Sequence, residues 1–312
     1  FLREKPSRSV LAGGIDMTPV VVSAEWLLDN IDRVRVLDAS SHLPTVKRDA
    51  SAEFLAAHIP GARRFDIDAI ADKGHAMPHM VPSPDFFAKC VATLGVSNDD
   101  HVVFYDDSDV KTAARGWWMM RLFGHEPVSI LDGGLAAWKA AGGPLEQGEP
   151  AAIAPGSFTS RPAIGVGVVD IGSLAAAVSG GDAGQIVDAR AAARFAGEAP
   201  EPRPGLRAGH IPGSHNLPFN KLLNEDGTYR NGAAIRQLFV DAGIDPDAPV
   251  TASCGSGITA CVLAAGLALA GNGDVTVYDG SWTEWGSSDE PSKQTHRLQG
   301  SLEAGPSGSG SG

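Results

Sequence analysis

The sequence predicts an α/β protein built of two tandem domains, each a parallel sheet flanked by helices. Its 312 residues are enough for about two domains, each with a core of its own. Short motifs recur in the two halves of the chain at a nearly constant shift. Within each half, β-branched runs alternate with helical stretches, which is the pattern of parallel strands covered by helices on both faces.

The internal repeat is visible in three motifs that occur once in each half. Their shifts are 150, 152 and 147 residues, for Asp38 and Asp188, for His58 and His210 of the His-Ile-Pro-Gly motifs, and for Asp132 and Asp279. A nearly constant offset between well-separated positions indicates that one domain has been duplicated.

The expected elements follow the order of the chain. Helices are predicted to begin at Ser23-Ala-Glu25 and at Pro84-Asp85, where an acidic residue falls in the first turn. The predicted strands are the β-branched runs 34–37, 102–105 and 128–131 of the first half and 185–187, 250–253 and 275–278 of the second. An Ala/Leu-rich helix is expected directly after Thr259.

Composition sets the expected domain boundaries. We expect a first domain at 17–145, a linker rich in Pro, Gly and Ser at 146–162, and a second domain at 163–291. The segments 1–16 and 292–312 look foreign to the fold, because the first lacks an initiator Met and the second ends in a Gly/Ser run. They are expected to be added or linker sequence, and a short remnant of a transit peptide is the weaker alternative for the first of them.

Charge and cysteine content exclude several classes of protein. The net charge is -12, with 37 acidic against 25 basic residues, which excludes a nucleic-acid surface. No apolar run approaches the roughly 18 residues of a membrane-spanning helix, so no membrane partner is expected. The three cysteines form neither an even framework nor a CxxC pair, which disfavours a disulfide scaffold and a metal site. The sequence therefore predicts a cytoplasmic protein.

Cys254 is the most informative residue of the chain. It lies where an apolar strand breaks into the run Cys254-Gly-Ser-Gly-Ile-Thr259 and then enters a helix. In such a junction, backbone N–H groups and the helix dipole converge on the centre of the turn and favour a negative charge there. We therefore predict that Cys254 is a thiolate nucleophile.

The loop and its flanks resemble a known family. Cys254-Gly-Ser-Gly-Ile-Thr-Ala is similar to the active-site loop of the 3-mercaptopyruvate sulfurtransferases, members of the tandem-domain rhodanese superfamily. The resemblance covers roughly residues 18 to 290, and its other motifs are Gly209-His-Ile-Pro-Gly-Ser214, Tyr278-Asp-Gly-Ser-Trp282, Thr283-Glu-Trp285, Trp117-Trp118 and Leu131-Asp-Gly-Gly134.

The resemblance implies two rhodanese-like domains and a sulfurtransferase. Sulfur would move from 3-mercaptopyruvate to Cys254 as a persulfide, with release of pyruvate, and then to a thiol or to cyanide. No metal or organic cofactor is implied. The expected partners are a small anionic sulfur donor and a thiol acceptor, for which a thioredoxin-like protein is one candidate.

The resemblance also assigns binding residues. Arg194 and Arg203 match the family's substrate-binding pair, and the planar guanidinium suits a carboxylate. Arg190 is expected to brace the loop by pairing with an acid. The loop residues expected to contact the donor are Gly255, Gly257, Ile258 and Thr259.

A Ser-His-Asp arrangement across the two domains is a further implication of the resemblance. The matching positions are Ser256, His79 and Asp68. A serine hydroxyl polarised by a histidine can donate a hydrogen bond to the donor carbonyl as an enolate develops. By contrast, His58 and His210 recur in both copies although only one copy carries the cysteine, so we expect them to be structural.

Two alternatives to this function remain open. A thiosulfate sulfurtransferase could use the same scaffold, although the positions after the cysteine, Gly255 and Ser256, are not the basic residues typical of that activity. A sulfur carrier or interaction module without catalysis is the other. A cysteine phosphatase is disfavoured, because Ala260 stands where it would need an arginine.

The two halves differ at the position of the nucleophile. Aligning the copies places Asp106 of the first half opposite Cys254. The first domain therefore lacks the nucleophile and is expected to form a wall of the second domain's site. The remaining cysteines, Cys90 and Cys261, fall in helical patterns and are expected to pack in the core.

Overall fold

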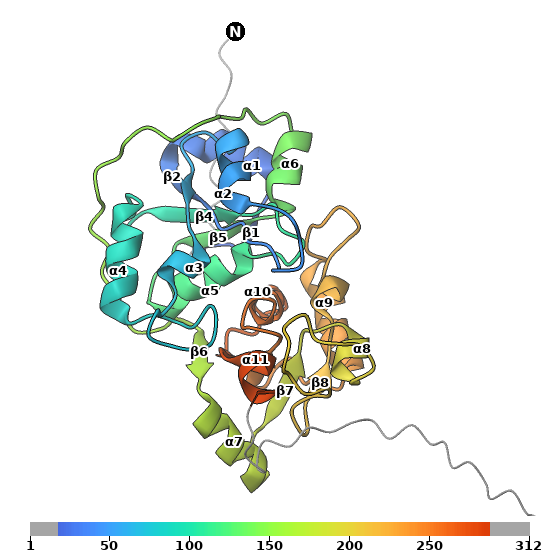
Figure 1. Cartoon of the computed structure of the whole chain (residues 1–312). Helices are drawn as coiled ribbons and strands as arrows, with labels where there is room; N and C mark the ends of the chain where they lie inside the picture. The colour runs from blue at the N-terminus through green and yellow to red at the C-terminus, as the bar shows by residue number, and fades with distance from the viewer. Residues whose placement is uncertain (1–17, 288–312) are drawn as a thin grey trace, which may run out of the picture.

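The computed structural model describes residues 18–287, so the terminal segments expected at 1–16 and 292–312 lie outside the described residues. Figure 1 shows two α/β halves that lie against each other. Each half contains a five-stranded sheet whose strand pairs are all parallel. The predicted fold class is therefore confirmed.

The first sheet has the strand order β1-β5-β4-β2-β3. Its strands are β1 (Val21–Val22), β2 (Val34–Asp38), β3 (Arg63–Arg64), β4 (His101–Tyr105) and β5 (Val128–Leu131). Its α-helices are α1 (Ala24–Asn30), α2 (Ala50–Ala56), α3 (Ile67–Ile70), α4 (Pro84–Thr93), α5 (Ala113–Leu122) and α6 (Gly134–Ala140).

The second sheet repeats this order as β6-β10-β9-β7-β8. Its strands are β6 (Val166–Val169), β7 (Gln185–Asp188), β8 (His215–Asn216), β9 (Val250–Ser253) and β10 (Val275–Tyr278). Its α-helices are α7 (Ile171–Gly180), α8 (Ala192–Phe195), α9 (Gly232–Asp241), α10 (Ala260–Leu269) and α11 (Ser281–Trp285). The identical strand order of the two sheets agrees with the duplication read from the sequence.

The six predicted strands are the inner three of each sheet, and all six are present. The predicted helix starts are also confirmed, because Ser23 and Ser83 accept hydrogen bonds from the N–H groups of Trp26 and Phe86 as N-caps. Four strands were not predicted: β1, β3, β6 and β8. All four are sheet edges, and three of them are only two residues long, too short for an alternating pattern to register.

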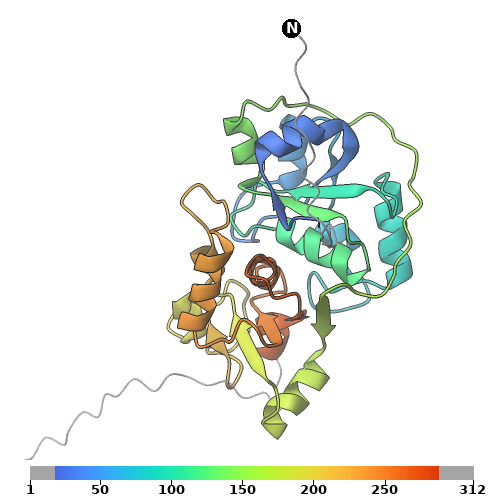
Figure 2. The same cartoon turned by 180° about the vertical axis from the view of Figure 1, so that it is seen from behind.

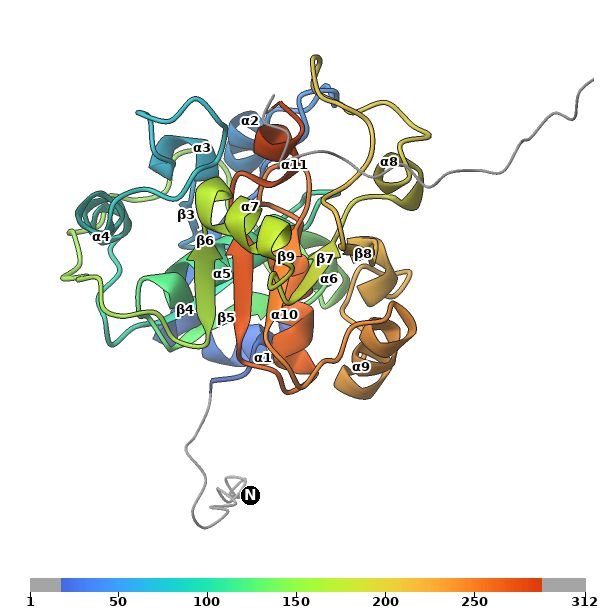
Figure 3. The same ribbon diagram turned by 90° about the horizontal axis from the view of Figure 1, so that it is seen from below.

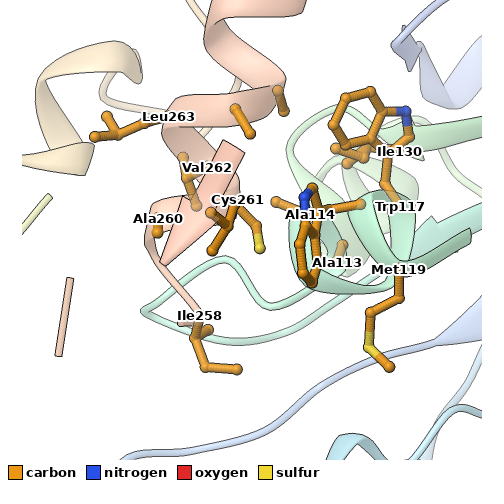
Figure 4. Packing of buried hydrophobic residues seen from close by; sticks show 14 of the residues in the cluster. Ala113, Ala114, Trp117, Met119, Ile130, Ile258, Ala260, Cys261, Val262 and Leu263 are labelled. Carbon is orange, nitrogen blue, oxygen red and sulfur yellow. The ribbon is translucent and has the colours of Figure 1, made fainter. Parts of the chain in front are cut away.

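One of the buried apolar clusters in residues 18–287 extends across both halves, and each half also has a smaller cluster of its own. Helix α5 packs against α10, and residues of both helices belong to the same buried cluster. Figure 4 shows Ala113, Ala114 and Trp117 of α5 lying opposite Cys261 of α10. In Figures 1 and 2, α10 lies between the second sheet and the first half, and the view from below in Figure 3 shows the second sheet in front of the first half. The small side chains of Ala113, Ala114 and Cys261 let α5 and α10 approach closely. The first half is therefore packed against the helix that follows Cys254.

Two hydrogen bonds across this interface are equivalent in the two copies of the repeat. Asp279 Oδ2 accepts a hydrogen bond from the Val81 N–H at 2.6 Å. Asp132 Oδ1 accepts one from the Tyr229 N–H at 2.8 Å. Asp132 and Asp279 are the repeat-related aspartates, and each binds a backbone N–H of the other half.

A single buried arginine adds a contact that has no such counterpart. Arg115 of α5 is fully buried and forms an ion pair of 2.7 Å with Asp279, whose side chain is 3% exposed. Its guanidinium also stacks on Trp118, 4.6 Å from the ring centre. Two opposite charges are thus withdrawn from water at the interface, where each depends on the other for stabilisation.

The segment between the two sheets runs over the outside of the first half, past α4, before it enters β6 (Figures 1 and 2). It is held at several points by hydrogen bonds, for example from Gly156 N–H to Ala92 O and from Arg161 N–H to Phe123 O. We propose residues 146–162 as the interdomain linker. Hydrogen bonds from the backbone of Glu146 and Gly148 to the first half attach its other end as well.

Replacing Arg115 by methionine should destabilise the protein strongly, because Asp279 would be left buried without its counter-charge. Breaking a buried pair in this way typically costs about 3–5 kcal/mol. We expect a clear fall in the midpoint of urea unfolding followed by tryptophan fluorescence. The matched control is Arg236→Met, since Arg236 pairs with Asp247 at an exposed site. An Arg115→Met midpoint equal to that of the control would contradict this interpretation.

Candidate active site

Cys254 lies at the carboxyl end of β9, in the turn that leads into α10. Only 1% of its surface is exposed. The strand-turn-helix junction predicted from the sequence is therefore present, at the edge of the sheet where α/β proteins bind their ligands.

The backbone N–H groups of the loop fall into two sets. Those of Cys254 and Gly257 donate to the hydroxyl of Ser281, at 3.0 and 3.2 Å, and that hydroxyl oxygen lies 3.9 Å from the Cys254 sulfur. Within residues 18–287, the N–H groups of Gly255, Ser256, Ile258 and Thr259 have no protein acceptor. Four backbone N–H groups of the loop are therefore free to stabilise a negative charge, as expected from the sequence. The N–H groups of Cys254 and Gly257 are not among them, because they bind Ser281.

Ser281 was missed as a site residue. It is fully buried and has a φ of 49°, in the left-handed region that non-glycine residues rarely adopt. The first half has Gly134 at the equivalent position, with a φ of 60°. The sequence signal that could have identified Ser281 is a serine at the position where the other copy has a glycine. A residue kept in a strained conformation needs a compensating contact, and here the hydroxyl of Ser281 binds the cysteine loop.

Only one of the two loop glycines is required by the backbone. Gly257 has a φ of 76°, and a Cβ there would lie 2.7 Å from the backbone oxygen of Asp279. Gly255 does not have a positive φ, and a Cβ there would meet only the end of the Arg194 side chain, at 3.3 Å. The close approach that the loop needs is therefore at Gly257.

A cavity of about 350 Å³ opens above Cys254. Of the ten candidate residues, only Gly257 is not part of the cavity wall. The nine that line the cavity are Asp68, His79, Arg194, Arg203, Cys254, Gly255, Ser256, Ile258 and Thr259. The first half contributes further residues, among them His42, Val110 and Thr112. The expectation that the first half forms a wall of the site agrees with this lining.

The two candidate substrate-binding arginines are in different electrostatic surroundings. Arg194 is paired with Glu201 through Nη2, at 2.5 Å. Arg203 forms no ion pair with a carboxylate among the residues that the structure describes, and its Nη2 lies 3.4 Å from His79 Nε2. Burial lowers the pKa of the Arg203 guanidinium from its usual value, and this effect is opposed by the Asp68 carboxylate.

Arg190 is a bracing residue, as expected from the sequence. It binds Asp188 through Nε and Nη2, at 2.9 and 2.7 Å from Oδ2, and it binds Glu201 at 2.8 Å. Its guanidinium stacks on Trp282, 4.3 Å from the ring centre. Glu201 was not singled out from the sequence, although it lies between the arginines in the run Glu201-Pro-Arg203.

The proposed Ser-His-Asp arrangement is only partly assembled. His79 Nδ1 lies 2.9 Å from Asp68 Oδ1, and this contact with His79 is the main reason why the pKa of Asp68 is lowered. Ser256 lines the same cavity, but no hydrogen bond joins it to His79. The structure therefore brings the histidine and aspartate together, with the histidine beside Arg203, and places the serine on the wall of the same cavity.

Arg115 lies beneath the site and was also missed. Its guanidinium donates to the backbone oxygen of Gly257 at 3.2 Å and to that of His79 at 2.6 Å. It therefore contacts the cysteine loop of the second half and the histidine loop of the first. In the sequence it is one residue of a helix beside two tryptophans, with no local signal of this role.

The first half has a carboxylate where the second half has the nucleophile. Asp106 is buried and accepts hydrogen bonds from the N–H groups of Ala113 and Ser108, at 2.7 and 3.3 Å. Burial raises the pKa of this carboxyl group. Two N–H groups at this loop of the first half thus bind the protein's own carboxylate.

His58, His210 and Cys261 have the structural surroundings that were expected, whereas Cys90 is only partly buried and packs against the edge of the core. His58 and His210 stack on Phe54 and Phe195, with ring centres 4.2 and 3.9 Å apart. Cys261 is buried, donates to the Gly257 backbone oxygen at 3.2 Å, and has its pKa raised to about 12 by burial.

Residues 18–287 contain neither a metal-binding cluster nor a membrane-spanning helix. No cluster of three His, Cys, Asp or Glu side chains is arranged to hold a metal ion. None of the helices in this part of the chain has the length and apolar character needed to cross a membrane.

Comparisons with known proteins agree with this architecture. The family "Rhodanese-like domain" matches residues 23–141 and 171–288. The chain is 44% identical to the 3-mercaptopyruvate sulfurtransferase of Mus musculus over 278 residues, covering 85% of this chain and 91% of the relative. It is 42% identical to the thiosulfate sulfurtransferase of Gallus gallus over 273 residues, covering 85% and 92%.

A solved structure is similar as well. The crystal structure of SseA from Escherichia coli, a 3-mercaptopyruvate sulfotransferase, superposes with a TM-score of 0.76 at 39% identity, over 85% of this chain and 99% of that one. With two matched domains, a cysteine loop at the carboxyl end of a parallel sheet, and relatives that cover most of its length, the chain belongs to the rhodanese family as a two-domain member.

Proposed function

We propose that this protein is a 3-mercaptopyruvate sulfurtransferase with Cys254 as its nucleophile. The observation that carries the proposal is the placement of the Cys254 sulfur in a cavity that Arg203 and Arg194 also line. A thiolate reacts with the donor sulfur, and a guanidinium binds the donor carboxylate. Similar relatives named for this activity support the same assignment.

The first half-reaction moves one sulfur atom to the enzyme. The Cys254 thiolate attacks the donor sulfur, so that an S–S bond forms and the donor's C–S bond breaks. The electron pair of the C–S bond passes into the adjacent carbonyl group as an enolate, which takes up a proton at carbon and leaves as pyruvate. The free N–H groups of the loop stabilise the negative charge of the sulfur throughout.

The proposed role of Ser256, His79 and Asp68 is to stabilise the developing enolate. The His79 imidazole, fixed by Asp68, lies beside Arg203 on the cavity wall. Donor binding would bring the carbonyl oxygen between Ser256 and this imidazole, and both can then donate hydrogen bonds to it. Gly255, Ile258 and Thr259 shape the wall around the donor.

The second half-reaction returns the enzyme to its starting state. A thiol acceptor attacks the outer sulfur of the persulfide as its thiolate, takes that sulfur, and releases Cys254 as a thiolate. We propose a small thiol or a thioredoxin-like protein as the acceptor. All three cysteines of the chain are free thiols in the structure, in keeping with the reducing cytoplasm that we propose as the location.

Thiosulfate is the alternative donor. One similar relative is named a thiosulfate sulfurtransferase, so the scaffold does not decide between the donors. The loop favours 3-mercaptopyruvate, because no basic side chain directly follows Cys254. Comparing kcat/KM for the two donors at matched ionic strength decides between them.

Treatment with 3-mercaptopyruvate in the absence of an acceptor should add one sulfur atom, about 32 Da, to Cys254 alone. Intact-mass spectrometry, peptide mapping and an assay of released pyruvate measure this. Cys254→Ser should abolish both mass gain and pyruvate release, whereas Cys90→Ser and Cys261→Ser should retain them. Sulfur addition that persists in Cys254→Ser would show that another residue is the nucleophile.

Arg203→Ala should lower kcat/KM for 3-mercaptopyruvate by about one to two orders of magnitude, because a charge-assisted hydrogen bond is worth roughly 1.5–3 kcal/mol. Arg194→Ala should cost less, since Glu201 already holds Arg194. Arg236→Ala, which removes an exposed arginine far from the cavity lining, is the matched control. Equal kinetic losses at positions 203 and 194 would contradict the distinction between the two arginines.

A further inference from the structure

A carboxylate lies inside the cavity that we assign to an anionic donor. Glu201 lines this cavity, and its side chain is only 4% exposed. Oε1 accepts from Arg190 at 2.8 Å, while Oε2 accepts from Nε and Nη2 of Arg194, at 3.1 and 2.5 Å. A buried negative charge beside an anion site opposes the binding of the anion, so its presence there requires an explanation.

The explanation begins with the balance of charge around Glu201. Arg190 and Arg194 supply two positive charges, and Asp188 and Glu201 supply two negative charges through direct ion pairs. The cluster of these four residues is therefore neutral. Arg194 lines the cavity and can donate hydrogen bonds to a ligand there. Because it is paired with Glu201, the cluster adds no net positive charge to the cavity.

Arg203 is then the cation that remains for the donor. It has no carboxylate at ion-pair distance in residues 18–287, and its only polar side-chain contact there is with His79. The nearby Asp68 is paired with His79. The cavity thus combines a guanidinium that has no direct carboxylate partner in residues 18–287 with a neutral four-residue cluster and the Asp68–His79 pair, so little positive charge is left for a second negative charge on the donor.

We propose that Glu201 determines donor specificity, by keeping the cavity too weakly positive for a dianion while it orients Arg194 for a carboxylate. This inference rests on the function proposed above and identifies the donors as monoanions. 3-Mercaptopyruvate carries one carboxylate, whereas thiosulfate carries two negative charges. A buried charge in the wall of the cavity, in an effective dielectric constant of about 20, changes the binding of each additional donor charge by on the order of tenfold.

Three variants separate the charge of Glu201 from its shape. Glu201→Gln keeps the shape and removes the charge, so the ratio of kcat/KM for thiosulfate to that for 3-mercaptopyruvate should rise about tenfold. Glu201→Asp keeps the charge and shortens the side chain, so activity with both donors should fall while the ratio stays close to that of the unchanged protein. Glu198→Gln removes an exposed charge from the same segment and should change neither value.

A fourth variant gives the opposite sign and does not depend on the folding of Glu201→Gln. Arg194→Gln removes one of the two arginine partners of Glu201 and leaves Arg190 in place, so the cluster gains a net negative charge and the donor ratio should move further toward 3-mercaptopyruvate. Circular dichroism and thermal unfolding establish which variants are folded before the kinetics are compared.

The outcomes distinguish this inference from the proposed function. Failure of the unchanged protein to release pyruvate from 3-mercaptopyruvate would overturn the function itself. If pyruvate is released, but Glu201→Gln and Arg194→Gln both alter the two donors by equal factors, the function stands and the role of Glu201 is wrong. An equal shift of the ratio in Glu201→Asp and Glu201→Gln would also overturn it, because shape rather than charge would then set the preference.

Discussion

The buried ion pair between Arg115 and Asp279 is the contact on which the geometry of the site depends. Both charges are withdrawn from water, so each is stable only while the two halves are docked. The same guanidinium holds the backbone oxygens of Gly257 and His79. The loop of the nucleophile and the loop of the imidazole come from different halves, yet both are positioned against one side chain.

The site arises where the two copies differ within an otherwise repeated framework. Strand order, the α5–α10 packing and the reciprocal aspartate contacts are common to both halves. At the loop itself, Asp106 stands opposite Cys254 and Gly134 opposite Ser281. In one copy the loop is filled by a carboxylate, and in the other a strained serine holds it open around a thiol. The two loops therefore differ both at the position of the nucleophile and at the position that holds it.

Features of the fold and the site could be predicted from the sequence where the residues that determine them are close together in the chain. The inner strands and the Cys254 loop have strong local patterns, and both were predicted correctly. The edge strands β1, β3 and β8 have two residues each, and no pattern can form over that length. Arg115, Glu201 and Ser281 could not be found in the same way, because their importance lies in partners that are distant in sequence or in a backbone angle. Ser256 and His79 were assigned together by resemblance, but the structure places them on one cavity without a hydrogen bond.

The linker has a consequence for how the protein could be divided. Gly156 and Arg161 tie its second part to the first half, whereas the α5–α10 packing and the Arg115–Asp279 pair hold the halves together without using the connection. Continuity of the chain between residues 149 and 155 is therefore not what maintains the assembly. Two polypeptides that meet in this stretch contain every contact of the interface, which makes the protein a candidate for reconstitution from separately produced fragments.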